Sequence, residues 1–217
     1  MRNTREPLAR EGHLEYDRVL FFNDAVFAIA ITLLVVDLRP PASSVYAGTA
    51  LRQAVPSIIG FAISFAVIGL FWLGHHGIFR YVNAFDRRLV LLNLLFLGTI
   101  AFLPYPTELL SQGSGSQTPA VIFYAACAAA AGLAEAAVWL YATRAGLAER
   151  ASPPLRRYYL LRILRVPAVF LLSIPVALIS PTLAAYLWIL IWVTDLTLRR
   201  RAPLPDPEDQ LHKGHEP

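Results

Sequence analysis

The sequence predicts an all-α integral membrane protein with six transmembrane helices, and three observations support this class. Hydrophobic residues make up 56% of the 217 residues and charged residues 16%, whereas a soluble domain carries about 25% charged residues. Long uncharged runs occupy 53–79, 89–107 and 166–194, and each approaches or exceeds the roughly 20 residues that cross a bilayer as a helix. The apolar residues are continuous rather than alternating, which argues against a β-barrel.

The expected helices follow one another along most of the chain, so that one membrane domain covers 18–198. They are expected at 18–38, 52–77, 88–110, 119–142, 160–179 and 182–198. The polar segment 1–17 is charged for too long to be a signal peptide, so the first apolar run is expected to be a retained helix. The segment 199–217 is rich in proline and charge and is expected to be a disordered tail.

A proline divides the apolar run 166–194 into two short helices. The residue before a proline disfavours the α conformation, so Ser180-Pro181 is expected to break the run at a tight external turn. One uninterrupted helix would instead give five crossings and would place the basic residues after 198 outside. Pro167 and Pro175 are expected to kink the fifth helix.

The distribution of basic residues tests this helix scheme and orients it. The chain contains 19 lysines and arginines. In the six-helix scheme, the tails and loops on one side of the membrane hold 17 of them, and the loops on the other side hold 2. Cytoplasmic segments of membrane proteins carry the excess of basic residues, so both termini are expected in the cytoplasm. The positive charge therefore follows the membrane topology, and no nucleic-acid partner is expected.

The first helix carries an acidic residue, Asp24, about one turn inside its apolar run. An unpaired charge at this depth costs several kcal/mol, and an ionisable residue there is a functional-site candidate by default. Arg18 lies about 9 Å away along the helix axis, at 1.5 Å per residue. The two residues are not direct helical neighbours, so each is expected to find its partner on another helix.

The expected partners of Asp24 come from the second and third helices. His75 and His76 end the second helix on the cytoplasmic side, and Trp72 and Asn93 add nearby hydrogen-bond donors. Such a network either fixes the packing of the helices or forms a gate controlled by protonation, since histidine changes charge near neutral pH. The sequence leaves both interpretations open.

An apolar stripe follows the first helix beyond Asp24. Ile29, Leu33 and Val36 are spaced i, i+4 and i+7 on one helical face, and Thr32 flanks them with a hydroxyl. By itself such a stripe is typical of a face toward lipid or the protein core. Alanines that permit close helix approach surround it: Ala25, Ala28 and Ala30.

Other chemistry is not indicated by the sequence. TVGYG-like loops, arginine-repeat helices, glycine-rich phosphate loops, CxxC pairs and HExxH are missing, and adjacent His75 and His76 form a poor chelate. No enzyme, metal site or cofactor is therefore expected. Glu135, inside the fourth helix, is interpreted either as a hydrogen-bonding partner between helices or as part of a cation path. Cys127 is interpreted as a small packing residue.

Two motifs resemble those of a known family. The first is Arg18, followed by Phe22-Asn23-Asp24 and AVFAIAITLLVVDL; the second is the segment 71–110, FWLGHHGIFRYVNAFDRRLVLLNLLFLGTIAFLPYPTELL. Together they resemble the bacterial relatives of the endolysosomal potassium channel, transmembrane protein 175, over roughly half the chain. Asn23 replaces the serine usual in the family, and Ala25 stands where bacterial members often have glycine.

The resemblance implies a homotetramer of six-helix subunits in which four copies of the first helix line a pore. Ile29 matches the narrowest hydrophobic ring, Leu33 and Val36 match rings farther outward, and Thr32 matches a hydroxyl layer. The resemblance and the pairing argument together predict a network that anchors the pore helix: Arg18, Phe22, Asn23, Asp24, Trp72, His75, His76 and Asn93.

The leading functional prediction is a passive potassium-permeable cation channel with weak selectivity over sodium, without a cofactor, in the inner membrane of a bacterium. Its partners are the lipid bilayer, other copies of the chain and monovalent cations. Two alternatives remain: a proton-coupled transporter that uses Asp24 with His75 and His76, and a non-conducting membrane scaffold or sensor.

Overall fold

The computed structural model describes residues 5–36, 38, 47–111, 117–149 and 151–199. These residues are almost entirely helical, and the helices run in the following order: α1 (Arg5–Val36), α2 (Ala47–Phe79), α3 (Arg87–Phe102), α4 (Pro104–Ser111), α5 (Thr118–Arg144), α6 (Pro153–Ile179), α7 (Pro181–Leu187) and α8 (Ile189–Arg199). The all-α class is therefore confirmed. The proposed tail at 199–217 lies, apart from Arg199, outside the described residues.

Six stretches within the described residues are long and apolar enough to cross a membrane, as predicted. They are Asp17–Val36, Arg52–Phe79, Arg87–Ser111, Thr118–Arg144, Pro153–Ile179 and Pro181–Leu198. Three helices begin at least five residues earlier than the hydropathy pattern indicates. Helix α1 starts at Arg5 rather than 18, α2 at Ala47 rather than 52, and α6 at Pro153 rather than 160. Proline favours the first turn of a helix, and it lies in the first turn of α1 and α6, whose added segments are polar sequence that hydropathy does not register.

Prolines mark two of the interruptions between helices, whereas α7 and α8 are separated at Trp188. The break at Ser180-Pro181 is confirmed: Ser180 is extended, with φ −153° and ψ 114°, and its hydroxyl accepts a hydrogen bond from the Leu183 N–H. A second break, absent from the sequence prediction, separates α3 from α4 at Pro104. Proline lacks an N–H and cannot continue the hydrogen-bond ladder. By contrast, α6 continues through both of its internal prolines.

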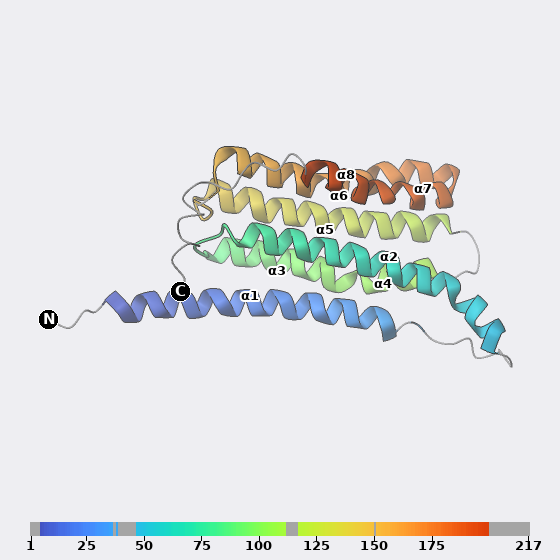
Figure 1. Ribbon diagram of the computed structural model, residues 1–217, viewed down its shortest axis with the longest axis horizontal. Coiled ribbons are helices and arrows are strands. Elements are labelled where there is room, and N and C mark those ends of the chain that lie inside the picture. Colours follow the sequence, from blue (N-terminus) through green and yellow to red (C-terminus); the bar gives the residue numbers. More distant parts are fainter. Residues whose placement is uncertain (1–4, 37, 39–46, 112–116, 150, 200–217) are drawn as a thin grey trace.

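The helices form a bundle with α5 near its centre and α1 along one outer edge (Figure 1). Helix α5 contacts α3 and α4 on one side and α6 on the other, whereas α1 contacts α2, α3 and α4. The close contact between α5 and α6 requires a glycine. A Cβ at Gly132 would lie 2.6 Å from Cδ of Pro167, so only glycine fits beside the proline ring.

Buried polar groups in the bundle are bonded to one another. The Ser64 hydroxyl donates to the Tyr124 hydroxyl over 3.1 Å and lies 2.7 Å from the Thr107 hydroxyl. The Trp188 indole donates to the Ser173 hydroxyl over 2.9 Å. Unsatisfied polar groups are costly in an apolar interior, so these bonds allow the helices to pack closely without water.

One end of the bundle is closed by loop contacts. The Asp86 carboxylate caps α3 by accepting the Leu89 N–H at 2.7 Å, and it also accepts the Tyr141 hydroxyl from α5. The Tyr141 bond is the main reason that the pKa of Asp86 lies below its ordinary value, and the Leu89 bond adds to it. The Asn83 N–H donates to the Leu147 carbonyl over 2.8 Å, which joins the loop before α3 to the loop after α5.

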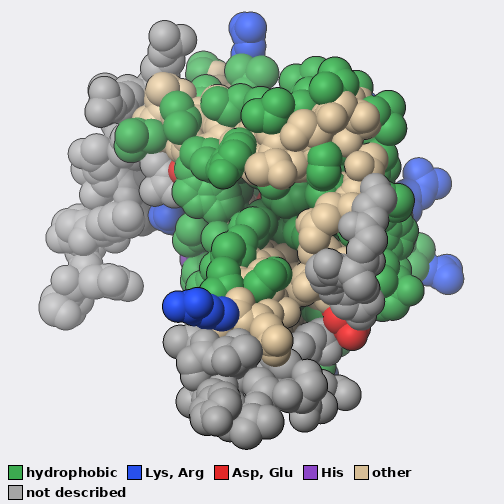
Figure 2. Space-filling model, turned by 90° about the vertical axis from the view of Figure 1, so that its right-hand side faces the viewer, with side chains coloured by type: hydrophobic (Ala, Val, Ile, Leu, Met, Phe, Trp, Pro, Cys, Tyr) green, Lys and Arg blue, Asp and Glu red, His purple; other side chains and the backbone are tan. Residues whose placement is uncertain are grey.

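The outside of the bundle is largely apolar. Large hydrophobic side chains are exposed on α1, α2, α3, α6, α7 and α8. On the face shown in Figure 2, hydrophobic side chains cover most of the described surface, and charged side chains stand mainly at its margins. An exposed apolar surface of this extent fits a chain surrounded by lipid or by other subunits.

Candidate functional site

Helix α1 has two distinct faces. One face packs against the protomer through residues spaced i, i+4, i+7 and i+11: Asn23, Phe27, Ala30 and Leu34, each at most 3% exposed. The opposite face carries the apolar stripe. Ile29, Leu33 and Val36 are 58%, 44% and 61% exposed, so they project away from their own protomer together.

Thr32 also lies on the exposed face of α1. Its hydroxyl donates to the Ile29 carbonyl over 2.9 Å, which is a hydrogen bond within the helix. The oxygen therefore keeps lone pairs available outside the helix while its proton is engaged. Among the predicted pore residues, Thr32 thus supplies the polar atom between the side chains of Ile29 and Val36.

Asn23 joins α1 to two other helices. Its Oδ1 accepts the Asn93 amide of α3 at 2.8 Å, and its Nδ2 lies 3.0 Å from Nε2 of His75 on α2. Because Oδ1 is the acceptor for Asn93, Nδ2 must donate to the histidine, which places a ring proton on His75 Nδ1. All three side chains are buried, so these bonds form without competition from water.

Aromatic rings hold the His75 side chain in place. Its ring centroid lies 4.2 Å from that of Phe79, 4.9 Å from that of Phe96 and 5.8 Å from that of Phe27. These rings come from α2, α3 and α1. His75 therefore presents Nε2 to Asn23 in one orientation, because the packed rings leave the imidazole little room to rotate.

Asp24 pairs with a tryptophan rather than with a histidine. The Trp72 indole of α2 donates to Asp24 Oδ1 over 2.8 Å. Among the described residues, no hydrogen bond links Asp24 to His75 or His76. The His76 ring instead lies 5.7 Å from the Trp72 ring. The expected carboxylate–histidine pairing is thus replaced by two separate contacts, Asn23 with His75 and Asp24 with Trp72.

Two residues of the predicted network remain apart from it within this protomer. Arg18 is exposed on α1, and Phe22 is 50% exposed on the same helix. In the described part of the chain, Arg18 forms no ion pair. The structure therefore brings together Asn23, Asp24 and their partners on α2 and α3, and leaves Arg18 and Phe22 on the surface.

A second polar cluster lies deeper in the bundle. On α6, Arg162 Nε lies 3.2 Å and Arg165 Nη2 lies 2.6 Å from Oδ1 of Asp195 on α8. Glu135 of α5 lines a small pocket together with the two arginines; the pocket measures about 10 Å³ and has room for about one water molecule. In the sequence these arginines serve only as topology signals, and no motif marks Asp195. An arginine pair at i, i+3 inside an apolar helix was the available signal.

Comparison with known proteins identifies the fold. The family model "Endosomal/lysosomal potassium channel TMEM175" matches residues 18–104, which include the Asn23 cluster and the exposed stripe of α1. A potassium channel of Streptomyces collinus is 41% identical over 138 residues, which cover 61% of this chain and 66% of that relative. The chain belongs to the TMEM175 family.

Other members of the TMEM175 family extend the comparison. A potassium channel of Chamaesiphon minutus is 38% identical over 102 residues, covering 45% of this chain and 50% of the relative. The crystal structure of a TMEM175 homolog from Chamaesiphon minutus, described as a lysosomal potassium-selective channel homolog, superposes with a TM-score of 0.71 at 27% identity. That match covers 85% of this chain and 98% of the other. The sequence matches thus span half to two thirds of these relatives. The matching family model is named for a channel rather than for an enzyme.

Proposed function

We propose that this chain forms a passive, potassium-permeable cation channel with weak selectivity over sodium. The observation that carries the proposal is the exposed stripe of Ile29, Leu33 and Val36 on α1, the helix at the edge of the bundle. Relatives with 41% and 38% identity are named potassium channels. In the proposal, the stripe forms the pore constriction, and K⁺ and Na⁺ are the permeant ions.

A pore of this kind requires several copies of α1 around one axis, and we assign four. The exposed apolar face of α1 is available for such an arrangement because its other face already packs on α2, α3 and α4. Helix α1 begins at one end of the bundle, and α8 runs from α7 back in the direction of that end (Figure 1). With the basic segments on that side, both termini face the cytoplasm of a bacterium, and the channel lies in its inner membrane.

Hydrophobic rings explain weak selectivity. Side chains of isoleucine, leucine and valine offer no oxygen ligands, so an ion passing them loses part of its hydration shell without replacement. Potassium holds its water less tightly than sodium and passes at lower cost. From Ile29 to Val36 the apolar section is about 10 Å long, at 1.5 Å per residue. Such a section conducts when wet and closes when it dewets.

The polar cluster anchors the proposed pore helix. The bonds of Asn23 to Asn93 and His75, and that of Asp24 to Trp72, hold one part of α1 to α2 and α3. Beyond this cluster, α1 is held to its protomer by apolar packing of Phe27, Ala30 and Leu34 in the hydrophobic core. The cluster therefore sets the rotation of α1 about its own axis, which decides whether Ile29 faces the pore.

Flux from purified protein in liposomes tests the proposal. Vesicles loaded with potassium should release it without a gradient of any second solute, and sodium should follow more slowly. Ile29→Asn should wet the constriction, raise the flux and reduce the preference for potassium. Leu172→Asn, at an exposed apolar position on α6, is the matched control and should leave both unchanged. The mass of the purified assembly checks the tetramer.

Two results would contradict the channel, and a third would contradict the assignment of its constriction. Flux that requires a pH gradient would favour the proton-coupled transporter. A folded protein that passes no potassium would favour the scaffold or sensor. Unchanged flux and selectivity in Ile29→Asn would remove Ile29 from the constriction.

A further inference from the structure

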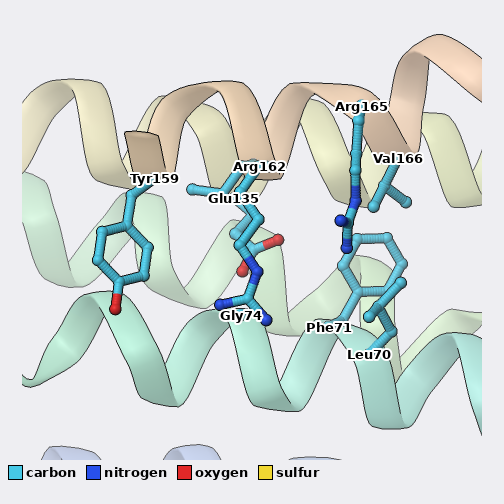
Figure 3. A pocket seen from close by; sticks show the side chains of 9 residues that line it. Leu70, Phe71, Gly74, Glu135, Tyr159, Arg162, Arg165 and Val166 are labelled. Carbon is cyan, nitrogen blue, oxygen red and sulfur yellow. The ribbon is translucent and has the colours of Figure 1, made fainter. Parts of the chain in front are cut away.

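The inner charge cluster, defined as Glu135, Arg162, Arg165 and Asp195, lies on the side of α2 that faces away from α1. Figure 3 shows Arg162 and Glu135 side by side over Gly74 of α2, with Arg165 one turn farther along α6. The cluster combines α5, α6 and α8. It is separate from the Asn23 contacts, which lie between α1, α2 and α3.

Glu135 differs from the other members of this cluster because it has no bonded partner for its Oε1 among the described residues. Two guanidinium groups face one Asp195 carboxylate, whose Oδ1 accepts from both. Glu135 is 2% exposed. Its carboxyl group lines the same pocket as both arginines, so it is enclosed beside them without an ion pair in the described part of the chain.

The carboxylate of Glu135 limits how closely α2 can approach α5. A Cβ at Gly74 would lie 2.7 Å from Glu135 Oε1, closer than nonbonded contact permits. A glutamate end can swing away where space exists, but here Phe71, Tyr159 and Arg162 line the same pocket. The absence of a side chain at Gly74 therefore allows the carboxylate to rest against the backbone of α2.

The opposite side of α2 holds the pore helix. At 3.6 residues per turn, Trp72 lies about 160° around α2 from Gly74. Trp72 donates to Asp24 of α1, and His75 accepts from Asn23. Helix α2 thus lies between the inner charge cluster and α1, and a shift of α2 at Gly74 moves the two bonds that anchor α1.

We propose that Glu135 is a positioning residue for the pore: its carboxyl group, enclosed in one pocket with the arginines of α6, sets the distance between α5 and α2 at Gly74. Because Trp72 and His75 of α2 bond to α1, this distance also determines the position of α1 relative to the rest of the protomer. The inference rests on the proposed channel function. Glu135 does not touch the permeant ion in this role; it acts through α2.

Gly74→Ala in the full chain is the direct test. The added methyl group pushes α2 toward α1 or displaces Glu135, so potassium flux per folded protein in liposomes should change by about threefold or more, together with the potassium-to-sodium ratio. Gly69→Ala is the matched control on the same helix, because a Cβ there meets nothing within 4 Å. Thermal stability, measured in parallel, separates flux effects from misfolding.

A second substitution tests the mechanism rather than the packing. Glu135→Asp keeps the carboxyl group and shortens the side chain by one methylene, so it makes room for the alanine. Gly74→Ala combined with Glu135→Asp should therefore return flux and ion ratio toward those of the unaltered protein. Gly74→Ala combined with Glu135→Ala makes room but removes the carboxyl group beside the arginines, so its flux and ion ratio should not return to those of the unaltered protein.

The outcomes separate the two proposals. If the unaltered protein and Gly69→Ala pass no potassium, the channel proposal fails. If both conduct and Gly74→Ala conducts equally well with the same ion ratio, the positioning role of Glu135 is wrong. If Gly74→Ala does not assemble, the single variant Glu135→Asp serves as the test. Altered flux in a stable Glu135→Asp protein supports the positioning role of Glu135, and unaltered flux overturns it.

Discussion

Replacing Asn23 by alanine should weaken the attachment of α1 more than any substitution on its exposed face. Asn23 is 1% exposed, and its amide bonds to Asn93 over 2.8 Å and to His75 over 3.0 Å. Both partners are themselves buried, at 2% and 3% exposed. The alanine variant leaves Asn93 Nδ2 and His75 Nε2 without these contacts.

The magnitude follows from two lost bonds. If each is worth the average of about 0.6 kcal/mol found between membrane helices, the cost is about 1 kcal/mol. If both buried partners stay unsatisfied, the cost rises to about 3 kcal/mol. A midpoint of about 2 kcal/mol lowers the Tm of a chain of this length by about 4–8 °C.

Thermal unfolding in detergent, followed by tryptophan fluorescence, measures this loss. Val35→Ala, at an exposed position of the same helix, is the control and should shift the Tm by less than half as much. A double-mutant cycle adds a sharper criterion. Asn23→Ala with Asn93→Ala should cost less than the two single changes together, because they remove the same bond. Additive losses, or an unchanged Tm in Asn23→Ala, would refute the three-helix bridge.

Two further predictions concern the rest of the bundle. Gly132→Ala should destabilise the protein by about 1–3 kcal/mol, because its methyl group meets the rigid ring of Pro167, whereas Gly98→Ala has open space and should have a small effect in the same unfolding assay. The pKa of Asp86 is lower in the folded state than its ordinary value of 3.8. The Asp86 carboxylate therefore stabilises the folded protein at pH values above 3.8, and this stabilisation is lost as the pH falls through the lower pKa of the folded state. Tyr141→Phe removes the largest cause of that shift; its Tm should therefore fall less steeply than that of the unaltered protein on acidification below about pH 5, and parallel curves would contradict this role.

Local sequence properties were sufficient to predict the helices. Apolar length determines whether a segment can span a bilayer, and the conformational restriction before Pro181 determines where the last run breaks. The spacing of Ile29, Leu33 and Val36 placed them on one face of α1 for the same reason, since the period of a helix is independent of its neighbours. The break at Pro104 was missed because apolar residues continue on both sides of it.

Side-chain partners across helices depended on the tertiary structure. The rotation of α2 about its axis brings Trp72, not a histidine, to Asp24, and it directs His75 toward Asn23. The pairing of Asp195 with the arginines of α6 depends likewise on how α8 packs against α6. Composition and periodicity determined that this protein is a six-helix membrane bundle with an apolar stripe on its first helix, because they act within each helix. Only the packed structure decided which polar groups meet, because hydrogen bonds and ion pairs need atoms within about 3–4 Å, and that proximity is set by helix rotation and crossing.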